Sequence, residues 1–218
     1  MTLFGIYRSA EELVEELRPE CSLFRTSGGG VTLTGGEPTL YPEFTARLGK
    51  SLHNEGIDVA LETCGFFNLE RLRPLLRELQ LVLFDIKVFD DALHRELCGA
   101  ENTVIKNNLK SLAEAWNKKE GPLIWPRLPI VPGMTDGQDN IKGWAGFLRG
   151  MGISFLTIIP YHAMGVNKRR WLGLPAGTEL RVPTDAELKS IEQLFFAEGI
   201  KVYRPGEENI KEYYHAAP

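Results

Sequence analysis

Short apolar runs rich in β-branched residues alternate along this chain with amphipathic stretches of helical spacing. The runs predict five β-strands, Val31–Thr34, Val59–Thr63, Leu81–Ile86, Leu123–Val131 and Phe155–Tyr161. The amphipathic stretches predict six helices, Ala10–Leu17, Glu43–Asn54, Leu69–Leu79, Ala100–Trp116, Asn140–Met151 and Thr184–Ala197. Continuous apolar strands between helices are typical of a parallel sheet buried on both faces. The pattern therefore predicts an α/β fold, a complete or partial barrel of β/α units.

The chain shows no sign of a second domain. Two predicted helices start with capping boxes, Ser9 with Glu12 and Thr184 with Glu187. No repeat of fixed period, low-complexity tract or linker interrupts the alternation. We therefore expect residues 1–218 to form a single domain.

Composition narrows the class of protein. The 25 Lys and Arg residues are outnumbered by 29 Asp and Glu residues, for a net charge of −4. That charge argues against a protein that binds nucleic acid or an anionic membrane through bulk electrostatics. No apolar run approaches the roughly 18 residues of a membrane span, and no leader precedes the first helix, so we expect a cytoplasmic protein.

The three cysteines, Cys21, Cys64 and Cys98, are 43 and 34 residues apart. An odd number at wide spacing is not a disulfide framework, and no CxxC or CxxxCxxC motif is present. The local sequence therefore offers no cysteine motif for zinc or for an iron–sulfur cluster.

Glycine or charged residues follow each predicted strand. These segments are Gly35–Pro38, Glu62–Gly65, Asp85–Lys87, Arg127 with Pro132–Gly133, and Pro160–His162. The carboxyl ends of parallel strands meet at one edge, where α/β proteins place their chemistry. We therefore expect an active site at this edge.

The glycines allow three interpretations. The run Ser27–Gly30 with Gly35 and Gly36 matches neither phosphate-loop pattern, so a nucleotide-phosphate cradle is disfavoured. The glycines could serve only tight turns around a strand. Alternatively, they let backbone amides approach a small polar ligand, with the Glu37 carboxylate facing an ammonium group.

Oxygen-bearing residues at two strand ends suggest a cation. Glu62, Thr63 and Asp85 make an all-oxygen set suited to a hard cation, although helix capping would explain the carboxylates equally well. Lys87 lies on the same strand face as Asp85, where a simple ion pair is the plainer interpretation.

Three further residues are candidates for the active site: His162, Arg127 and Cys64. A lone histidine such as His162 is more often structural than a ligand contact. Arg127, inside an apolar strand, must be paired or must meet a ligand. Cys64 lies at the predicted edge, but no base is evident for it, so a partly buried structural thiol is favoured.

The order of these segments resembles the radical S-adenosylmethionine superfamily, and within it the glycyl-radical-enzyme activating enzymes such as pyruvate formate-lyase activating enzyme. The SGGGVTLTGGEP segment, Ser27–Pro38, resembles their glycine-rich GGE segment. Four later segments agree in order: Glu62–Gly65; Asp85–Lys87 with Asp90 or Asp91, His94 and Gly99; Arg127–Gly133 with Thr135 and Asp136; and Ile159–His162 with Gly165 and Lys168. The resemblance extends from about Arg8 to Arg204.

The resemblance implies a role for each matching position. Gly35, Gly36 and Glu37 would contact the methionine amino group of S-adenosylmethionine, and Asp85, Ile86, Lys87, Glu62 and His162 would complete the binding site for this cosubstrate. A monovalent cation near the methionine carboxylate would use Glu62, Thr63 and Asp85. Arg127 would contact the glycine-bearing loop of a partner, the glycyl radical enzyme.

The family's chemistry uses a [4Fe–4S] cluster held by CxxxCxxC and reduced by a flavodoxin or ferredoxin. One electron from the cluster cleaves S-adenosylmethionine, and the resulting radical removes hydrogen from the partner's glycine. The CxxxCxxC loop and the strand before it are absent from this sequence, and its three cysteines are spaced too widely to replace them. The resemblance therefore implies an N-terminally truncated partial barrel, missing the first strand and cluster loop and inactive by itself, with no catalytic residue identifiable without the cluster.

The departure from the family pattern leaves alternatives open. The chain could be a natural cluster-less protein that binds S-adenosylmethionine or a partner. It could also be an unrelated metabolic barrel enzyme that uses Lys87 and His162 as acid and base. An unpaired Val31–Thr34 edge predicts either self-association along that strand or coverage of the edge by the Ala10–Leu17 helix.

Overall fold

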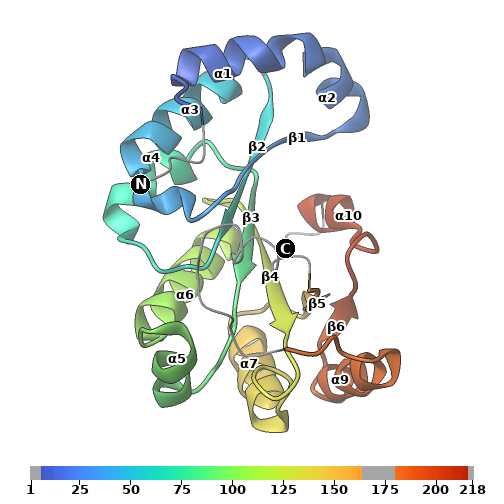
Figure 1. The fold of residues 1–218 in the computed structure, drawn as a ribbon. Coiled ribbons are helices and arrows are strands. Elements are labelled where there is room, and N and C mark those ends of the chain that lie inside the picture. Colours follow the sequence, from blue (N-terminus) through green and yellow to red (C-terminus); the bar gives the residue numbers. More distant parts are fainter. Residues whose placement is uncertain (1–5, 164–179, 216–218) are drawn as a thin grey trace.

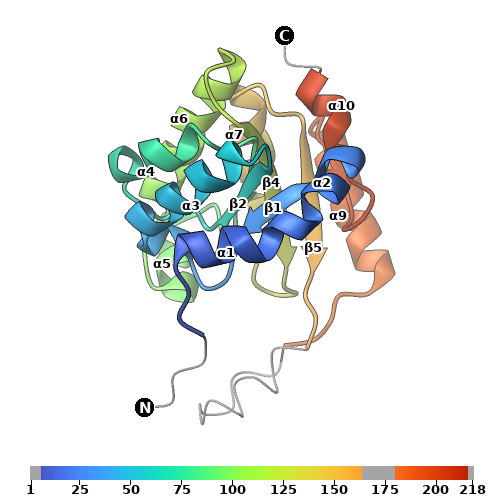
Figure 2. The same ribbon diagram turned by 90° about the horizontal axis from the view of Figure 1, so that it is seen from above.

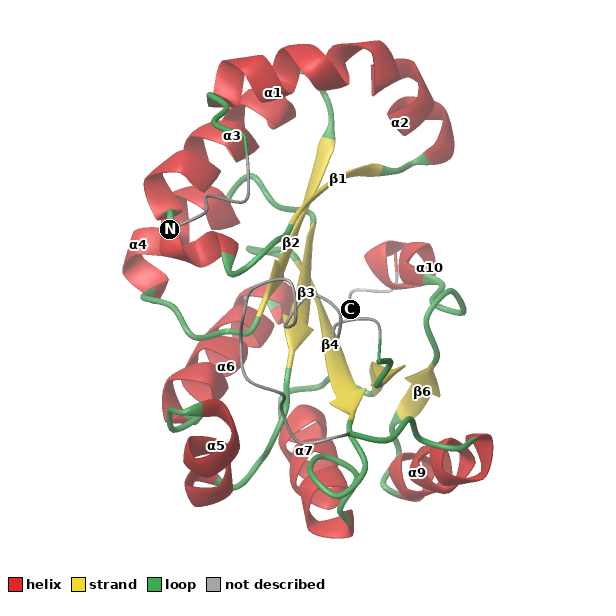
Figure 3. Cartoon of the chain, viewed as in Figure 1, coloured by secondary structure: helices red, strands yellow, loops and turns green. Residues whose placement is uncertain are grey.

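The computed structural model describes residues 6–163 and 180–215. Its centre is one sheet of six parallel strands in the order β1-β2-β3-β4-β5-β6, surrounded by helices (Figures 1 and 3). The strands are β1 (Gly30–Leu33), β2 (Asp58–Thr63), β3 (Leu81–Asp85), β4 (Leu123–Ile130), β5 (Phe155–Pro160) and β6 (Lys201–Tyr203). The predicted α/β fold with a parallel sheet is confirmed, and all five predicted strands are present within one residue at each end.

Helices precede the first strand, lie between successive strands and follow the last strand. They are α1 (Ala10–Leu17), α2 (Cys21–Ser27), α3 (Pro42–Asn54), α4 (Leu69–Leu76), α5 (Asp91–Cys98), α6 (Thr103–Asn117), α7 (Gln138–Gly150), α9 (Asp185–Ala197) and α10 (Ile210–His215). Two 3₁₀ turns, η1 (Arg18–Glu20) and η2 (Pro38–Leu40), complete the described elements. Both predicted capping boxes form, at the starts of α1 and α9. Within the described residues, no helix is both long and apolar enough to cross a bilayer.

Side chains alternate between the two faces of the sheet. The outer face packs under the helices that link the strands and supplies fully buried side chains such as Leu61 and Phe84. Helix α1, placed by the sequence as one possible cover for the edge of β1, packs against α3 (Figure 2). Among the described residues, β1 has a strand partner, β2, on one edge only.

Helix α10 covers the inner face toward the amino ends of the strands. The ring of Tyr213 lies 5.3 Å from that of Trp125 and 4.1 Å from that of Phe155, measured between centroids. Lys211 Nζ donates to the carbonyl oxygen of Ser27, at the end of α2, over 2.6 Å. Packing at the amino ends leaves the opposite edge of the sheet for chemistry.

The sequence analysis did not predict helices α2, α5 and α10 or strand β6, and α6 begins at Thr103 rather than at Ala100. The helical structure is interrupted between α5 and α6 because Gly99 adopts the left-handed conformation (φ 82°), which ends a helix.

Candidate functional site

The segments that follow β1 to β5 meet at one edge of the sheet, as predicted. Every neighbouring pair of strands is parallel, so the five carboxyl ends point the same way. We call this edge the carboxyl rim, made of Gly35–Glu37, Glu62–Gly65, Asp85–Lys87, Arg127 and Pro160–His162. Within the rim, the polar side chains form two separate contact groups, one around Glu37 and one around Arg127.

The glycine turn at the end of β1 exposes its backbone. Gly35 has a φ of 134°, which residues other than glycine rarely adopt. Both Gly35 and Gly36 are exposed, and a Cβ atom added at either would meet no heavy atom within 4 Å. The main-chain groups of this turn are therefore accessible to a small ligand.

The Glu37 carboxylate is held by neighbouring protein groups. Its Oε1 accepts hydrogen bonds from the Thr39 hydroxyl (2.7 Å), the Thr39 amide (3.3 Å) and the Thr63 hydroxyl (2.9 Å). Its Oε2 accepts from the backbone amide of Cys64 over 2.9 Å. Burial works to raise the pKa of Glu37, but these donors outweigh it and lower the pKa. The carboxylate thus ties the glycine turn to the end of β2.

Cys64 lies beside Glu37 as a half-buried thiol. Burial first, and then the adjacent Glu37 carboxylate, raise the pKa of the thiol. A protonated thiol is a poor nucleophile, which agrees with the structural role favoured from the sequence. The following residue, Gly65, must be glycine, since a Cβ atom there would lie 2.2 Å from the Phe84 ring.

Arg127 joins two carboxylates on the inner face of the sheet. Its Nε and Nη2 atoms each lie 2.7 Å from Asp85 Oδ1, and Nη2 lies 3.0 Å from Glu62 Oε1. The side chain of Arg127 is only 15 % exposed. Strand register brings Arg127 opposite Asp85, so the pairing follows from the sheet itself. Of the two alternatives for Arg127, a paired guanidinium is the one in the described structure.

The two sides of this ion pair respond differently to burial. Burial raises the pKa of Asp85 despite the opposing attraction of Arg127, and the nearby Glu62 charge raises it further. Burial opposes the charge on Arg127 too, but two carboxylates outweigh it and raise the pKa of the guanidinium. Arg127 therefore opposes both effects that raise the pKa of Asp85.

Lys87 and His162 complete the carboxyl rim. Lys87 is half-buried, and its charge opposes the burial that raises the pKa of Asp85 and Cys64. Among the described residues it has no ion pair within 4.0 Å, because Arg127 takes the Asp85 partner that the sequence suggested for Lys87. His162 is exposed beyond the end of β5. Gly165 and Lys168 lie outside the described residues.

The implied metal groups do not fit the side chains as they are arranged. The described part of the chain contains no group of three His, Cys, Asp or Glu residues able to hold a metal ion. Cys21, Cys64 and Cys98 begin α2, follow β2 and end α5, so they belong to three different elements. The Thr63 hydroxyl turns to Glu37 while Glu62 and Asp85 turn to Arg127, so the three proposed cation ligands do not converge.

The sequence analysis missed Thr39, which supplies two of the four hydrogen bonds to Glu37. A signal was available, because Glu37 is followed by proline and then threonine, and an acidic side chain before such a turn commonly caps it. Glu37 is the N-cap residue of η2. Thr39 is therefore a supporting residue of the glycine turn.

Most of the chain matches the sequence model of one protein family. The model described as "Radical SAM superfamily" matches residues 4–144. The chain belongs to the radical SAM superfamily. For this radical SAM chain, the alternative of an unrelated barrel enzyme is therefore set aside.

The relatives of this radical SAM chain are glycyl-radical-enzyme activating enzymes. It is 34 % identical over 197 residues to the choline trimethylamine-lyase activating enzyme of Oleidesulfovibrio alaskensis, covering 88 % of this chain and 62 % of the relative. It is 32 % identical over 195 residues to the pyruvate formate-lyase 2-activating enzyme of Escherichia coli, covering 89 % and 65 % respectively. The chain thus spans less than two thirds of the length of these relatives.

A solved structure shares the radical SAM fold over almost its whole length. The crystal structure of a domain of pyruvate-formate lyase-activating enzyme from Bacteroides vulgatus matches with a TM-score of 0.66 and 27 % identity. The match covers 82 % of this chain and 99 % of that domain. The six-stranded parallel sheet is therefore the partial barrel of this superfamily.

Proposed function

We propose that this chain supplies the S-adenosylmethionine-binding rim of a glycyl-radical-enzyme activating enzyme. The observation that carries the proposal is the meeting of five motif segments at the carboxyl rim, in a chain whose curated relatives are activating enzymes. The partner would be a glycyl radical enzyme, and the reductant a flavodoxin or ferredoxin in the cytoplasm.

Each rim residue has a proposed task in binding S-adenosylmethionine. The exposed backbone of Gly35 and Gly36 would accept the methionine amino group, and Glu37 would fix the shape of that turn. The Lys87 ammonium, His162 and Asp85, with Ile86 in the same segment, would contact the rest of the cosubstrate. The binding proposal is supported by the open backbone of the glycine turn and by the lack of a close ion-pair partner for Lys87 among the described residues.

The first prediction tests this binding site. We expect the 218-residue chain to bind S-adenosylmethionine weakly, in the absence of an iron–sulfur cluster. Lys87→Ala is expected to lower the affinity about tenfold, which corresponds to the loss of one charge-assisted hydrogen bond. Isothermal titration calorimetry measures both, and the exposed Lys50→Ala on α3 is the matched control. Equal affinity in wild type and Lys87→Ala would remove the proposed role of the carboxyl rim.

A second prediction concerns the [4Fe–4S] cluster, which we propose that this chain alone does not assemble. The reason is that the three cysteines lie on three different elements. Anaerobic reconstitution with iron and sulfide is expected to give no stoichiometric cluster, as measured by iron analysis and Mössbauer spectroscopy. Four bound irons per chain, lost in Cys64→Ser, would contradict the proposal. A natural cluster-less protein that binds S-adenosylmethionine would also assemble no cluster in this experiment. It would differ by keeping its affinity for S-adenosylmethionine.

For the cation, we propose that Arg127 must move before Glu62 and Asp85 can act as ligands, because its guanidinium now lies between them. Release of Arg127 would also make it available to the glycine-bearing loop of the partner. This proposal reconciles the two roles that the resemblance assigns to one cluster.

A third prediction concerns the open edge of β1, through which we propose that the chain self-associates. Its residues Gly30 and Thr32 are exposed, and unpaired edges of parallel sheets recruit other strands. Sedimentation velocity is expected to show dimers that Thr32→Lys, a charge on the edge, shifts toward monomers. A wild-type chain that remains monomeric at high concentration would contradict the proposal.

A further inference from the structure

Residues 87–89, after β3, are held by side chains rather than by backbone pairing, whereas the amide of Ile86 before them still donates to the Arg127 carbonyl over 2.9 Å. Residues 86–90 have no regular secondary structure, yet they carry Lys87 between the end of β3 and the start of α5. Val88 is 1 % exposed. The polar backbone groups of a buried irregular segment require partners from elsewhere in the fold.

One partner is Asn140 on α7, which is 9 % exposed. Its Nδ2 donates to the carbonyl oxygens of Lys87 (3.0 Å) and Thr135 (2.8 Å). Its Oδ1 accepts from the backbone amide of Phe89 over 2.6 Å. A single amide therefore fixes the backbone on both sides of Val88.

The other partners come from the start of α6. The side chain of Asn102 is fully buried, and its Nδ2 donates to the carbonyl oxygens of Val88 (2.5 Å) and Phe89 (2.8 Å). Lys106 Nζ donates to the same Phe89 carbonyl over 2.6 Å and lies 4.0 Å from the centre of the Phe89 ring.

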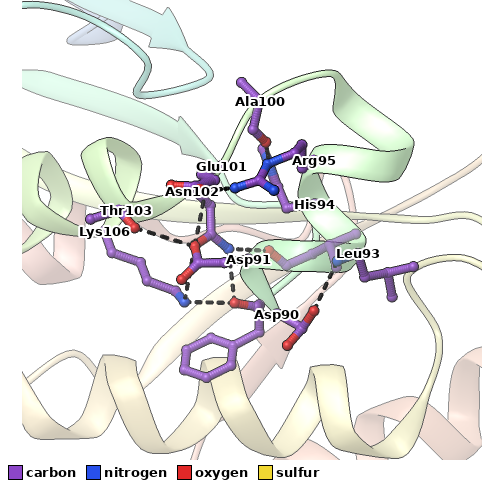
Figure 4. A network of polar contacts seen from close by, with 12 residues as sticks. Asp90, Asp91, Leu93, His94, Arg95, Ala100, Glu101, Asn102, Thr103 and Lys106 are labelled. Carbon is purple, nitrogen blue, oxygen red and sulfur yellow. Dashed lines mark hydrogen bonds and ion pairs between the residues drawn. The ribbon is translucent and has the colours of Figure 1, made fainter.

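Asp91 connects this group to α5. Its Oδ1 accepts a hydrogen bond from the backbone amide of Asn102 and lies 4.0 Å from Lys106 Nζ. Figure 4 shows Asn102, Thr103 and Lys106 converging on Asp91. The start of α6 is thereby locked to the start of α5, and both flank the segment that carries Lys87.

We infer that Asn140, Asn102 and Lys106 are positioning residues that hold Lys87 in place for its ligand. Each carbonyl from Lys87 to Phe89 accepts a hydrogen bond from at least one of these side chains. A binding group on a loop gains affinity when its backbone is fixed before the ligand arrives, because less ordering is left to the binding step. The inference rests on the proposed role of Lys87 in binding S-adenosylmethionine and adds the residues through which that role is achieved.

The first test replaces Asn140 by aspartate. Asn140→Asp keeps an acceptor for the Phe89 amide but places an oxygen against the carbonyls of Lys87 and Thr135. We expect the affinity for S-adenosylmethionine to fall about tenfold and amide hydrogen exchange at residues 86–90 to accelerate. Asn107→Asp, the same change at an exposed position on α6, is the control. A folded Asn140→Asp variant with wild-type affinity and exchange would overturn the inference.

A second pair of variants covers the case in which Asn140→Asp does not fold. Lys106→Met retains the aliphatic stem near the Phe89 ring and removes the ammonium group, which donates to the Phe89 carbonyl and lies 4.0 Å from Asp91 Oδ1. We expect Lys106→Met to weaken S-adenosylmethionine binding and Lys106→Arg, which restores an N–H donor, to recover it. Equal affinity in both variants would contradict the inference.

The two proposals fail separately. If Lys87→Ala binds S-adenosylmethionine as tightly as wild type, the proposed function of the carboxyl rim is wrong. Hydrogen exchange then decides the positioning role on its own. Faster exchange at residues 86–90 in Lys106→Met that returns to the wild-type rate in Lys106→Arg supports it, whereas unchanged exchange in both overturns it.

Discussion

Arg127→Met is expected to destabilise the fold by about 2–3 kcal/mol at pH 7, less than the roughly 3–5 kcal/mol that removal of one partner from a fully buried ion pair costs, because Asp85 and Glu62 are 25 % and 35 % exposed. Arg127 contacts Asp85 and Glu62 on the inner face of the sheet, and the variant would leave these two carboxylates side by side without a counter-charge. Urea denaturation monitored by circular dichroism measures the loss.

The pH dependence of this effect has a definite sign. Burial already raises the pKa of Asp85, and removal of Arg127 would raise the pKa further. A carboxyl whose folded-state pKa exceeds its unfolded value stabilises the fold when protonated, and that contribution disappears as pH rises through the folded pKa. We therefore expect the loss in Arg127→Met to be largest at neutral pH and to shrink as the pH falls toward 4.

Neutralising the carboxylates provides the control. Arg127→Met combined with Glu62→Gln and Asp85→Asn removes the unpaired charges, and it is expected to recover most of the lost stability, because a buried charged cluster can often be replaced by neutral groups without loss. A loss in Arg127→Met that is the same at pH 4.5 and at pH 7 would show that packing rather than charge is responsible.

The sequence predicted that Arg127 would be paired or would meet a ligand, but not which partner it takes. Asp85 lies 42 positions before Arg127, and only the register of β3 with β4 brings the two together. On sequence grounds, Lys87, two residues after Asp85, was the nearer cation for the Asp85 carboxylate. Local spacing cannot rank these cations, because the choice depends on the alignment of neighbouring strands.

The parallel sheet itself was predictable, since long apolar runs between amphipathic helices have few other solutions. Strand β6 was missed because it has only three residues, Lys201–Tyr203, one of them charged. The α10 helix was missed for a different reason. Its six residues are held on the inner face by tertiary contacts, such as that of Tyr213 with Trp125, which leave no periodic signal.

Glu37 shows a similar limit at the carboxyl rim. One of three interpretations of the preceding glycines placed its carboxylate against an ammonium group, a contact that the resemblance also implied. In the structure most of its hydrogen-bonding capacity is used by protein donors, two of which, Thr63 at the end of β2 and Cys64 directly after it, are 26 and 27 positions away. The exposed groups of this turn are the backbone atoms of Gly35 and Gly36.

Glu37→Ala is accordingly expected to lower the free energy of unfolding by about 2–3 kcal/mol, because it leaves the buried Thr63 hydroxyl and the Cys64 amide without their acceptor. Urea denaturation at pH 7 measures the change. The control is Glu43→Ala, whose carboxylate is exposed and pairs with Arg71 at the surface, where an ion pair contributes little to stability. Equal losses in the two variants would contradict the anchoring role of Glu37.

Glu37→Gln separates the charge of Glu37 from its shape. The glutamine can still accept from Thr39 and Thr63, but its amide nitrogen would face the donor of Cys64, so we expect a loss smaller than that of the alanine variant. Protein donors lower the pKa of Glu37 below its usual 4.5 despite burial. A depressed carboxyl pKa stabilises the fold above the unfolded-state pKa, and this contribution is lost as pH falls through the folded pKa. Below pH 4.5 the free energy of unfolding should therefore fall less steeply with pH in Glu37→Gln than in wild type. The same slope in both proteins would mean that the carboxylate is not the group that holds the glycine turn to β2.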